Sequence, residues 1–128
     1  MGGALCYDYD FPQIAAEHGA LGVDLVALPS SDWRGIDPIH SQMAAVRAIE
    51  QGVSIVRSTR FGLTAGIDSH GRLRAWSSSF DGGDRVTIVD LPSRGVATVY
   101  RRIGDAFAWL CAAAIGAALV TVVRRRRA

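Results

Sequence analysis

An uncharged run near the C-terminus constrains this chain more than any other feature. Residues 106–123 read AFAWLCAAAIGAALVTVV and are followed directly by four Arg at 124–127. A helix of about 18 residues is roughly 27 Å long, close to the hydrocarbon thickness of about 30 Å. A buried helix in a soluble core would also be apolar, but such a helix rarely ends in four consecutive Arg. We therefore predict one C-terminal transmembrane helix over 106–123.

The same run divides the chain into three parts. Positively charged residues next to a membrane span favour the cytoplasmic side. We expect residues 124–128 to form a basic cytoplasmic tail and residues 1–105 to form a domain on the other side of the membrane. Residues 1–30 contain no basic segment followed by an apolar run, so the sequence shows no secretory signal.

The charge balance of the domain differs from that of the whole chain. The chain has 14 basic and 12 acidic residues, a net charge of +2, and every basic residue is Arg. With the four Arg of the tail set aside, residues 1–105 are slightly acidic. A nucleic-acid partner is therefore not expected. The absence of Lys excludes any mechanism that needs a Lys from this chain.

Cysteine and histidine are sparse. The two Cys, at positions 6 and 111, lie in very different surroundings, which argues against a disulfide. The three His share no metal-ligand spacing with either Cys. The sequence contains no P-loop, no G-x-G-x-x-G and no G-x-S-x-G motif. We predict neither a metal nor a cofactor.

Short apolar runs alternate with helix signals along residues 1–105, and this predicts an α/β layer. Helical crossovers separate the first three runs, and Asp68-Ser69-His70-Gly71 is typical of a hairpin turn. We expect the helices on one face of the sheet, which leaves the other face in need of cover. The predicted strands are 3–6, 23–28, 53–58, 62–67, 72–78 and 85–91, and residues 29–37 form a loop.

Capping signals mark the two helices. Asp10 is predicted to cap the first, with Pro12 in its first turn and Gly19 at its end. Asp37 is predicted to cap the second, with Pro38 at its first position and Gly52 just past its end. Within that helix Ile39, Met43 and Val46 recur at i, i+4 and i+7, which predicts a buried face.

Cys6 is the candidate nucleophile. It lies where an apolar strand gives way to a helix, so its thiol would be exposed on a sharp turn near backbone N–H groups that favour a thiolate or an oxyanion. The alternative is a small core residue, which is the commoner fate of a lone Cys in a strand.

The residues around Cys6 resemble the carbon–nitrogen hydrolase (nitrilase) superfamily. Cys6-Tyr7-Asp8-Tyr9-Asp10-Phe11-Pro12 is similar to its C-Y-[DE]-x-x-F-P elbow. Further strings resemble the apolipoprotein N-acyltransferase branch. They are GVDLVALPS at 22–30, Asp32-Trp33, Pro38-Ile39-His40, RAIEQG at 47–52, VRSTRFG at 56–62, DSHGR at 68–72, and TVY at 98–100 followed by Gly104-Asp105.

The resemblance implies a fold and a chemistry. The fold is the second half of a nitrilase-type α-β-β-α sandwich, followed by one C-terminal transmembrane helix. The family uses a Glu–Lys–Cys triad, in which Cys6 would be the nucleophile and the backbone N–H of Tyr7 an oxyanion contact. Asp8, Trp33 and Glu50 are the further candidates to line the site. For Trp33 and Glu50, structural roles are equally compatible with the sequence.

Three positions depart from the branch's usual pattern. Asp8 stands where the branch usually has Glu, and Arg34 stands where its loop carries an aromatic residue. Asp10 occupies a position where soluble nitrilases often have Arg. The Arg34 difference argues against a phospholipid acyl donor, and the Asp10 difference argues against a plain amidase.

The resemblance therefore leaves three functions open. The first is a membrane-anchored acyltransferase that forms a thioester and passes the acyl group to an amine, with a phospholipid donor and a lipoprotein acceptor. The second is a membrane-anchored amidohydrolase. The third is a truncated, non-catalytic fragment, since the family's Glu and Lys belong to the half that precedes the Cys strand, and only five residues precede Cys6. The expected location is the inner membrane, with the domain on the periplasmic side.

Overall fold

A five-stranded mixed sheet organises the body of the molecule. The computed structural model describes residues 1–82 and 86–127. The strand order is β1 (Gly2–Gly3), β2 (Leu25–Ala27), β4 (Ser54–Arg57), β6 (Leu63–Ile67) and β7 (Leu73–Ser78). The first three strands are parallel and the last two pairings are antiparallel. Two short strands, β3 (Ser30–Ser31) and β5 (Thr59–Arg60), pair in parallel beyond the ends of β2 and β4.

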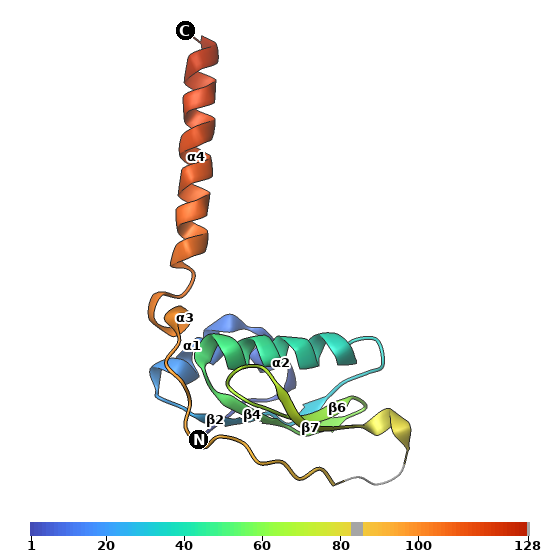
Figure 1. The fold of residues 1–128 in the computed structure, drawn as a ribbon. Helices are drawn as coiled ribbons and strands as arrows, with labels where there is room; N and C mark the ends of the chain where they lie inside the picture. Colours follow the sequence, from blue (N-terminus) through green and yellow to red (C-terminus); the bar gives the residue numbers. More distant parts are fainter. Residues whose placement is uncertain (83–85, 128) are drawn as a thin grey trace.

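The two crossover helices cover one face of this sheet. Helix α1 (Pro12–Ala20) connects β1 to β2, and α2 (Asp37–Gln51) follows β3 and leads into β4. Figure 1 shows both helices on the same side of the strands. Apolar side chains fill the space between the layers, among them Val26, Ile55 and Ile67 from the sheet. The predicted α/β layer with helical crossovers and a final hairpin is confirmed.

The helix starts differ from the predicted caps. A 3-10 helix, η1 (Cys6–Asp10), precedes α1, and Phe11 rather than Asp10 occupies the capping position. Asp37 is the first residue of α2, and its carboxylate accepts a hydrogen bond from the N–H of Leu63 at 2.5 Å. Both predicted Asp caps are wrong because tertiary partners take these carboxylates. Helix α1 also continues one residue past Gly19.

The buried face of α2 is also not the predicted one. Ile39 and Val46 are about half exposed, and Met43 is only partly buried. The face against the sheet carries smaller or polar residues, which are His40, Ser41, Ala44, Ala48 and Gln51. Small side chains let the helix approach the strands closely, and His40 and Ser41 have polar partners there. The periodicity identified an apolar stripe but not the side on which the sheet lies.

The hairpin turn is confirmed. The carboxylate of Asp68 accepts hydrogen bonds from the N–H groups of His70 and Arg72 at 2.9 and 3.0 Å. The next predicted strand, 85–91, is wrong over residues 86–91, which form no ladder, while Arg85 lies outside the described residues. A 3-10 turn, η2 (Ser79–Asp81), ends the hairpin instead.

Residues 86–97, which we call the strap, run in extended form across the strands. Thr87 contacts Ser77 of β7 through their hydroxyls at 2.6 Å, and Val89 packs on Gly66 of β6. Farther along, the Pro92 carbonyl accepts a hydrogen bond from Ser54 of β4. The strap therefore crosses the sheet from β7 toward β2, on the face opposite the helices (Figure 1). Crossing the strands is why it forms no ladder and how it covers part of the second face.

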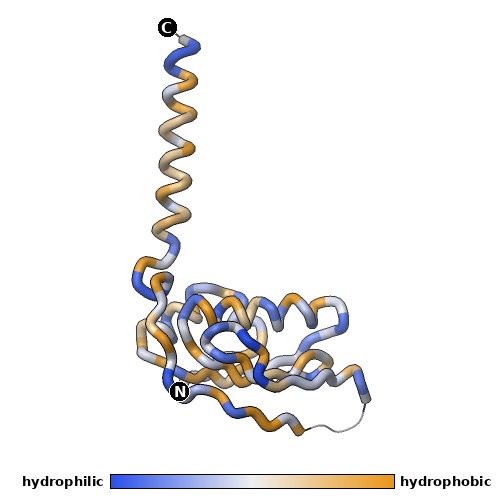
Figure 2. Tube along the Cα trace, viewed as in Figure 1, coloured by the Kyte–Doolittle hydropathy of each residue, from blue (hydrophilic) through white to orange (hydrophobic). Residues whose placement is uncertain are grey.

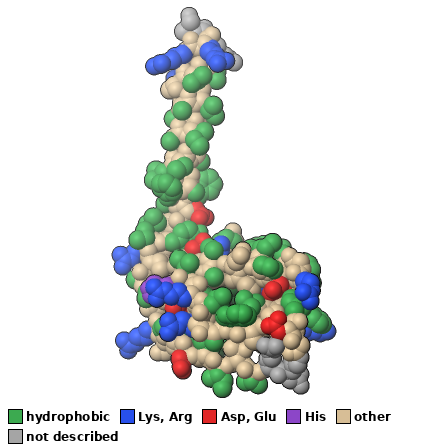
Figure 3. All heavy atoms as spheres, turned by 45° about the vertical axis from the view of Figure 1, so that its right-hand side comes forward, with side chains coloured by type: hydrophobic (Ala, Val, Ile, Leu, Met, Phe, Trp, Pro, Cys, Tyr) green, Lys and Arg blue, Asp and Glu red, His purple; other side chains and the backbone are tan. Residues whose placement is uncertain are grey.

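Two helices complete the chain. Helix α3 (Val99–Ile103) packs beside α1 and α2, and α4 (Ala106–Arg127) extends away from the body. Residues Ala106–Arg126 are long and apolar enough to cross a membrane, with a mean hydropathy of 2.3, and none of this stretch is buried. Figures 2 and 3 show its apolar shaft and its basic tip.

The contact between α2 and the strap yields a test. Gly52 ends α2 with a φ of 65°, and a Cβ there would overlap the Val96 carbonyl oxygen. Gly22 has a φ of 72° with nothing within 4 Å of a Cβ. We expect Gly22→Ala to cost about 1–2 kcal/mol, the left-handed penalty alone. Gly52→Ala should cost clearly more, because the strap must also move.

Thermal unfolding of the full chain in detergent, followed by circular dichroism, measures the difference. Equal losses of stability in the two variants would mean that the packing of the strap against the end of α2 does not constrain position 52.

Candidate active site

The candidate site lies at the carboxyl ends of the three parallel strands. Cys6 follows β1, Pro29 and Asp32 follow β2, and Thr59 follows β4. Open α/β sheets commonly bind ligands at this edge. The strand before Cys6 is shorter than predicted, since β1 ends at Gly3 and Cys6 begins η1. The thiol is therefore carried by a turn and not by a strand.

The backbone of Cys6 is strained. Its φ is 43°, and among the described non-glycine residues only Phe61 shares a positive φ. Such a conformation is costly for a residue with a Cβ and persists only where neighbouring contacts fix it. One such contact is the hydrogen bond from the Cys6 N–H to the Pro29 carbonyl at 2.9 Å. The Sγ lies 3.5 Å from the Ser31 carbonyl oxygen and is partly accessible.

Asp8 clamps the turn from the other side. Its carboxylate accepts a hydrogen bond from the Leu5 N–H at 3.0 Å, and its own N–H donates to the Leu5 carbonyl at 2.8 Å. Tyr7 lies between them in the first turn of η1, where backbone N–H groups lack intrahelical acceptors. Asp8 thus fixes the residues on both sides of the thiol.

A buried polar network lies behind Cys6. His40, on the first turn of α2, is 4% exposed and sits between two carboxylates. Its Nε2 is 3.0 Å from Asp10 Oδ2, and its Nδ1 is 2.9 Å from Asp32 Oδ1. Burial raises the pKa of the Asp10 carboxyl, and the neighbouring His40 and Arg57 partly offset that rise.

Arg57 neutralises Asp32. The guanidinium is 1% exposed, and its Nη2 donates to Asp32 Oδ2 at 2.6 Å. Its Nη1 donates to Thr59 Oγ1 at 2.6 Å and to the Leu63 carbonyl at 2.8 Å. Asp32, His40 and Arg57 all lie in the strings that resemble the acyltransferase branch, but those strings alone indicated no role for them. Their contacts join residues far apart in sequence, so no local signal could reveal the network.

The same cluster bears on metal binding. Cys6, Asp32 and His40 each offer one ligand atom, and these atoms lie within 4.8 Å of one another, although their sequence spacing gave no sign of it. The Asp32 oxygens already face Arg57 and His40, and the second His40 nitrogen faces Asp10. We therefore interpret the cluster as an ion-pair network rather than a metal centre.

Aromatic side chains gather around His40 next to the Cys6 turn. Trp33 is 60% exposed, and its ring lies edge-on to that of His40 with centroids 6.1 Å apart. Tyr7 contacts both His40 and Phe11 at 5.7 Å, and Tyr7 and Phe11 are also about half exposed. These three residues form an apolar patch beside the thiol, which we call the aromatic rim. Arg34 points elsewhere, with its guanidinium 4.3 Å above the Phe80 ring.

Glu50 is not brought to Cys6. It lies near the far end of α2, ten residues or about 15 Å along the helix from His40. Its carboxylate pairs with Arg47 at 2.6 Å, and burial raises its pKa. This pairing is the structural role that the sequence had left open. Cys111 lies on the exposed surface of α4.

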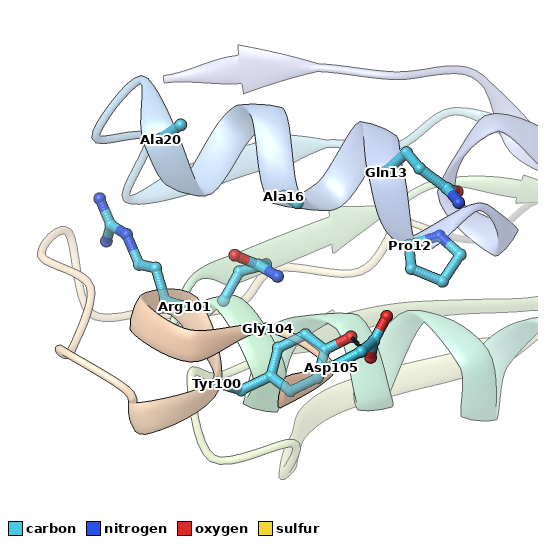
Figure 4. A pocket seen from close by; sticks show the side chains of 9 residues that line it. Pro12, Gln13, Ala16, Ala20, Tyr100, Arg101, Gly104 and Asp105 are labelled. Atoms are coloured by element: carbon cyan, nitrogen blue, oxygen red, sulfur yellow. Dashed lines mark hydrogen bonds between the residues drawn. The ribbon is translucent and has the colours of Figure 1, made fainter. Parts of the chain in front are cut away.

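One hollow in the surface lies beside the Cys6 turn, and another lies beside α1 and α3. An open depression of about 440 Å³ borders the Cys6 turn and is lined by Gly3, Ala4, Leu5, Asp8, Ala27 and Pro29. A smaller cavity of about 200 Å³ lies between α1, the end of α2, α3 and the turn before α4 (Figure 4). In it Tyr100 donates a hydrogen bond to Asp105 at 2.8 Å. The first hollow borders the turn that carries Cys6, whereas the lining of the second includes no residue of that turn.

Solved structures place this architecture in a known class. A mutant amidase from Nesterenkonia sp. AN1, described as showing Michael addition of acrylamide at the active site cysteine, matches 83% of this chain and 42% of its own with a TM-score of 0.67 at 20% identity. The Caenorhabditis elegans NitFhit protein matches 60% of this chain and 22% of its own, with a TM-score of 0.56 at 24% identity. The body thus has the carbon–nitrogen hydrolase fold.

Curated relatives define the branch. The apolipoprotein N-acyltransferase of Geobacter metallireducens is 31% identical over 99% of this chain, and that of Bradyrhizobium diazoefficiens is 35% identical over 95%. The chain spans only about a quarter of their length, 24% and 22%. No protein-family model matches the chain. Over nearly its whole length the chain is similar in sequence to apolipoprotein N-acyltransferases, and its body has the fold of the nitrilase superfamily.

The buried network predicts that the stability of the fold depends strongly on Arg57. Arg57→Leu leaves the Asp32 carboxylate buried without its cation, and we expect a loss of about 3–5 kcal/mol in unfolding free energy. The matched control is Arg74→Leu, because Arg74 is half exposed and 3.8 Å from Asp68. It should cost less than about 1 kcal/mol. Denaturant unfolding followed by Trp fluorescence measures both, and similar losses would contradict the assigned importance of Arg57.

Proposed function

We propose that this chain carries the nucleophile half of a membrane-anchored N-acyltransferase, with Cys6 as the acylated residue. The supporting observation is the thiol on a strained turn at the carboxyl edge of the sheet. Its sequence relatives bear the name apolipoprotein N-acyltransferase. A phospholipid donor and a lipoprotein acceptor follow from that name and are part of the proposal.

The reaction has two halves. The Cys6 thiolate attacks the ester carbonyl carbon of the donor, and the donor's alcohol leaves with a proton as a thioester forms. An amine then attacks the thioester carbonyl carbon, loses a proton, and releases the thiol. Each step passes through an oxyanion, and we propose that the Tyr7 N–H stabilises it.

We propose that the base and the cation of the family's triad come from outside these residues. The chain contains no Lys, and Glu50 is paired with Arg47 away from the thiol. We infer that the Glu and Lys of the family triad lie on a polypeptide segment beyond this sequence. The depression beside β1 and the Cys6 turn is where that segment would meet the nucleophile.

The remaining candidates take supporting roles. Asp8 holds the turn through its bonds to Leu5, and Trp33 belongs to the aromatic rim, which offers an apolar surface to an acyl chain. Because Arg34 stacks on Phe80, it leaves that surface apolar despite replacing an aromatic residue.

The amidohydrolase remains the second candidate, because the structural neighbours include amidases. In that case water rather than an amine takes the thioester. The two reactions differ in product: an acylated amine for the transferase, and a free fatty acid for the hydrolase.

Acylation of Cys6 tests the proposal. The 128-residue chain alone, incubated with phospholipid, should show no adduct, whereas the chain co-produced with a Glu- and Lys-containing half from an apolipoprotein N-acyltransferase should form a thioester on Cys6. Cys6→Ser should abolish the thioester, and Cys111→Ser should leave it unchanged. Intact-mass spectrometry reads the adduct.

Two results would contradict parts of this proposal. A stoichiometric adduct on the chain alone would show that no outside base or cation is needed. Absence of the adduct in the complemented sample would refute the acyltransferase assignment.

The membrane orientation is a separate proposal. We propose that α4 crosses the inner membrane with residues 124–128 in the cytoplasm and the body on the periplasmic side, because the four Arg resist translocation. The reporter is fused to the C-terminus of this chain, produced together with the half that carries the Glu and Lys. A green fluorescent protein fused there should fluoresce, and an alkaline phosphatase fused there should be inactive. Active phosphatase would reverse the orientation.

A further inference from the structure

His40 lies between two carboxylates, those of Asp10 and Asp32, in the network next to Cys6. Both ring nitrogens face a carboxylate oxygen, at 3.0 Å for Asp10 and 2.9 Å for Asp32. A neutral imidazole has one N–H donor and one bare nitrogen, so it can satisfy only one ionised carboxylate. The Nε2 atom is buried and lies 3.0 Å from Asp10 Oδ2 without a hydrogen bond, so a proton on one of these two atoms would be needed to balance the contact.

Such a proton would make the cluster neutral overall. Arg57 balances Asp32 through the 2.6 Å ion pair, and the shared proton balances Asp10. The remaining charged group that acts on Asp10 is Arg47, farther along α2. The burial that raises the pKa of Asp10 agrees with a carboxyl that keeps a proton close.

We propose that His40 is a positioning residue for Cys6: by balancing the charge of Asp10, it lowers the negative charge around the turn that carries the thiol and ties that turn to α2. This inference rests on the proposed role of Cys6 as the acylated residue.

Charge and geometry both support the assignment. A His40 nitrogen, an Asp32 oxygen and Cys6 Sγ lie within 4.8 Å of one another. Thiolate formation and the oxyanion both place negative charge at this position, which an unbalanced carboxylate would oppose. In addition, Asp10 belongs to η1 and Asp32 to the loop before α2, so one imidazole ties the Cys6 turn to both the loop and the helix.

A charge-selective alkylation experiment tests the proposal without any acyl transfer. The full chain with Cys111→Ser is kept in detergent at low ionic strength, so that Cys6 is the one thiol and charges are weakly screened. Rates of Cys6 alkylation are measured with anionic iodoacetate and with neutral iodoacetamide. The ratio of the two rates cancels changes in thiolate fraction or access and reports the charge near Sγ.

His40→Gln should lower the iodoacetate-to-iodoacetamide ratio by roughly three- to tenfold, because Asp10, at the end of the 3-10 helix that begins at Cys6, is left without its balancing charge. Adding Asp10→Asn should restore the ratio by removing that charge. The matched control is His70→Gln, which removes an exposed imidazole on the hairpin turn and should leave the ratio unchanged.

The outcomes separate the two proposals. A ratio that stays constant in His40→Gln, with both rates altered together, overturns the charge role and leaves only a structural one. If circular dichroism shows that His40→Gln does not fold, Asp10→Asn alone decides: it should keep the ratio at or above that of the parent, and a fall overturns the inference. A failure of Cys6 to become acylated in the complemented sample refutes the proposed function without affecting these ratios.

Discussion

The ion pair between Arg57 and Asp32 is the interaction on which the rest of the candidate site depends. A buried guanidinium must find acceptors for its donors, and here it finds Asp32, Thr59 and the Leu63 carbonyl. These partners belong to the loop between β3 and α2, to β5 and to β6. One charged side chain from β4 therefore holds together the strand ends from which the site is built. The cost of burying it is offset only because every partner is in place.

A chain of contacts connects this ion pair to the turn that carries the Cys6 thiol. Asp32 orients the His40 ring, the ring faces Asp10, and Asp10 ends the 3-10 turn that starts at Cys6. Hydrogen bonds from Cys6 to Pro29 and from Leu5 to Asp8 hold the same turn at its other end. A strained backbone at Cys6 persists because contacts on both sides fix it. The Cys6 thiol thus lies on a short turn that contacts on both sides hold in place.

The two faces of the sheet are covered in different ways. Helices α1 and α2 bury one face with small side chains at close range, whereas the strap crosses the other with single contacts to successive strands. After the strap, α3 packs beside α1 and α2, and α4 leaves the body with its apolar surface exposed. This arrangement gives the domain a fixed connection to the helix that we propose to be its membrane anchor.

The sequence by itself determined the local features. Alternating apolar runs gave the strands and crossovers, the Asp68 turn gave the hairpin, and the uncharged run gave the long apolar helix, because each depends on neighbours within a few residues. The motif around Cys6 indicated the superfamily for the same reason. Only the tertiary structure decided which face of α2 is buried, that Asp10 and Asp37 serve distant partners rather than helix caps, and that residues 86–91 cross the sheet rather than extend it. The Asp10–His40–Asp32–Arg57 network belongs to this second group, since its members come from four separate segments and only the packing of the layers brings their charges within hydrogen-bonding distance.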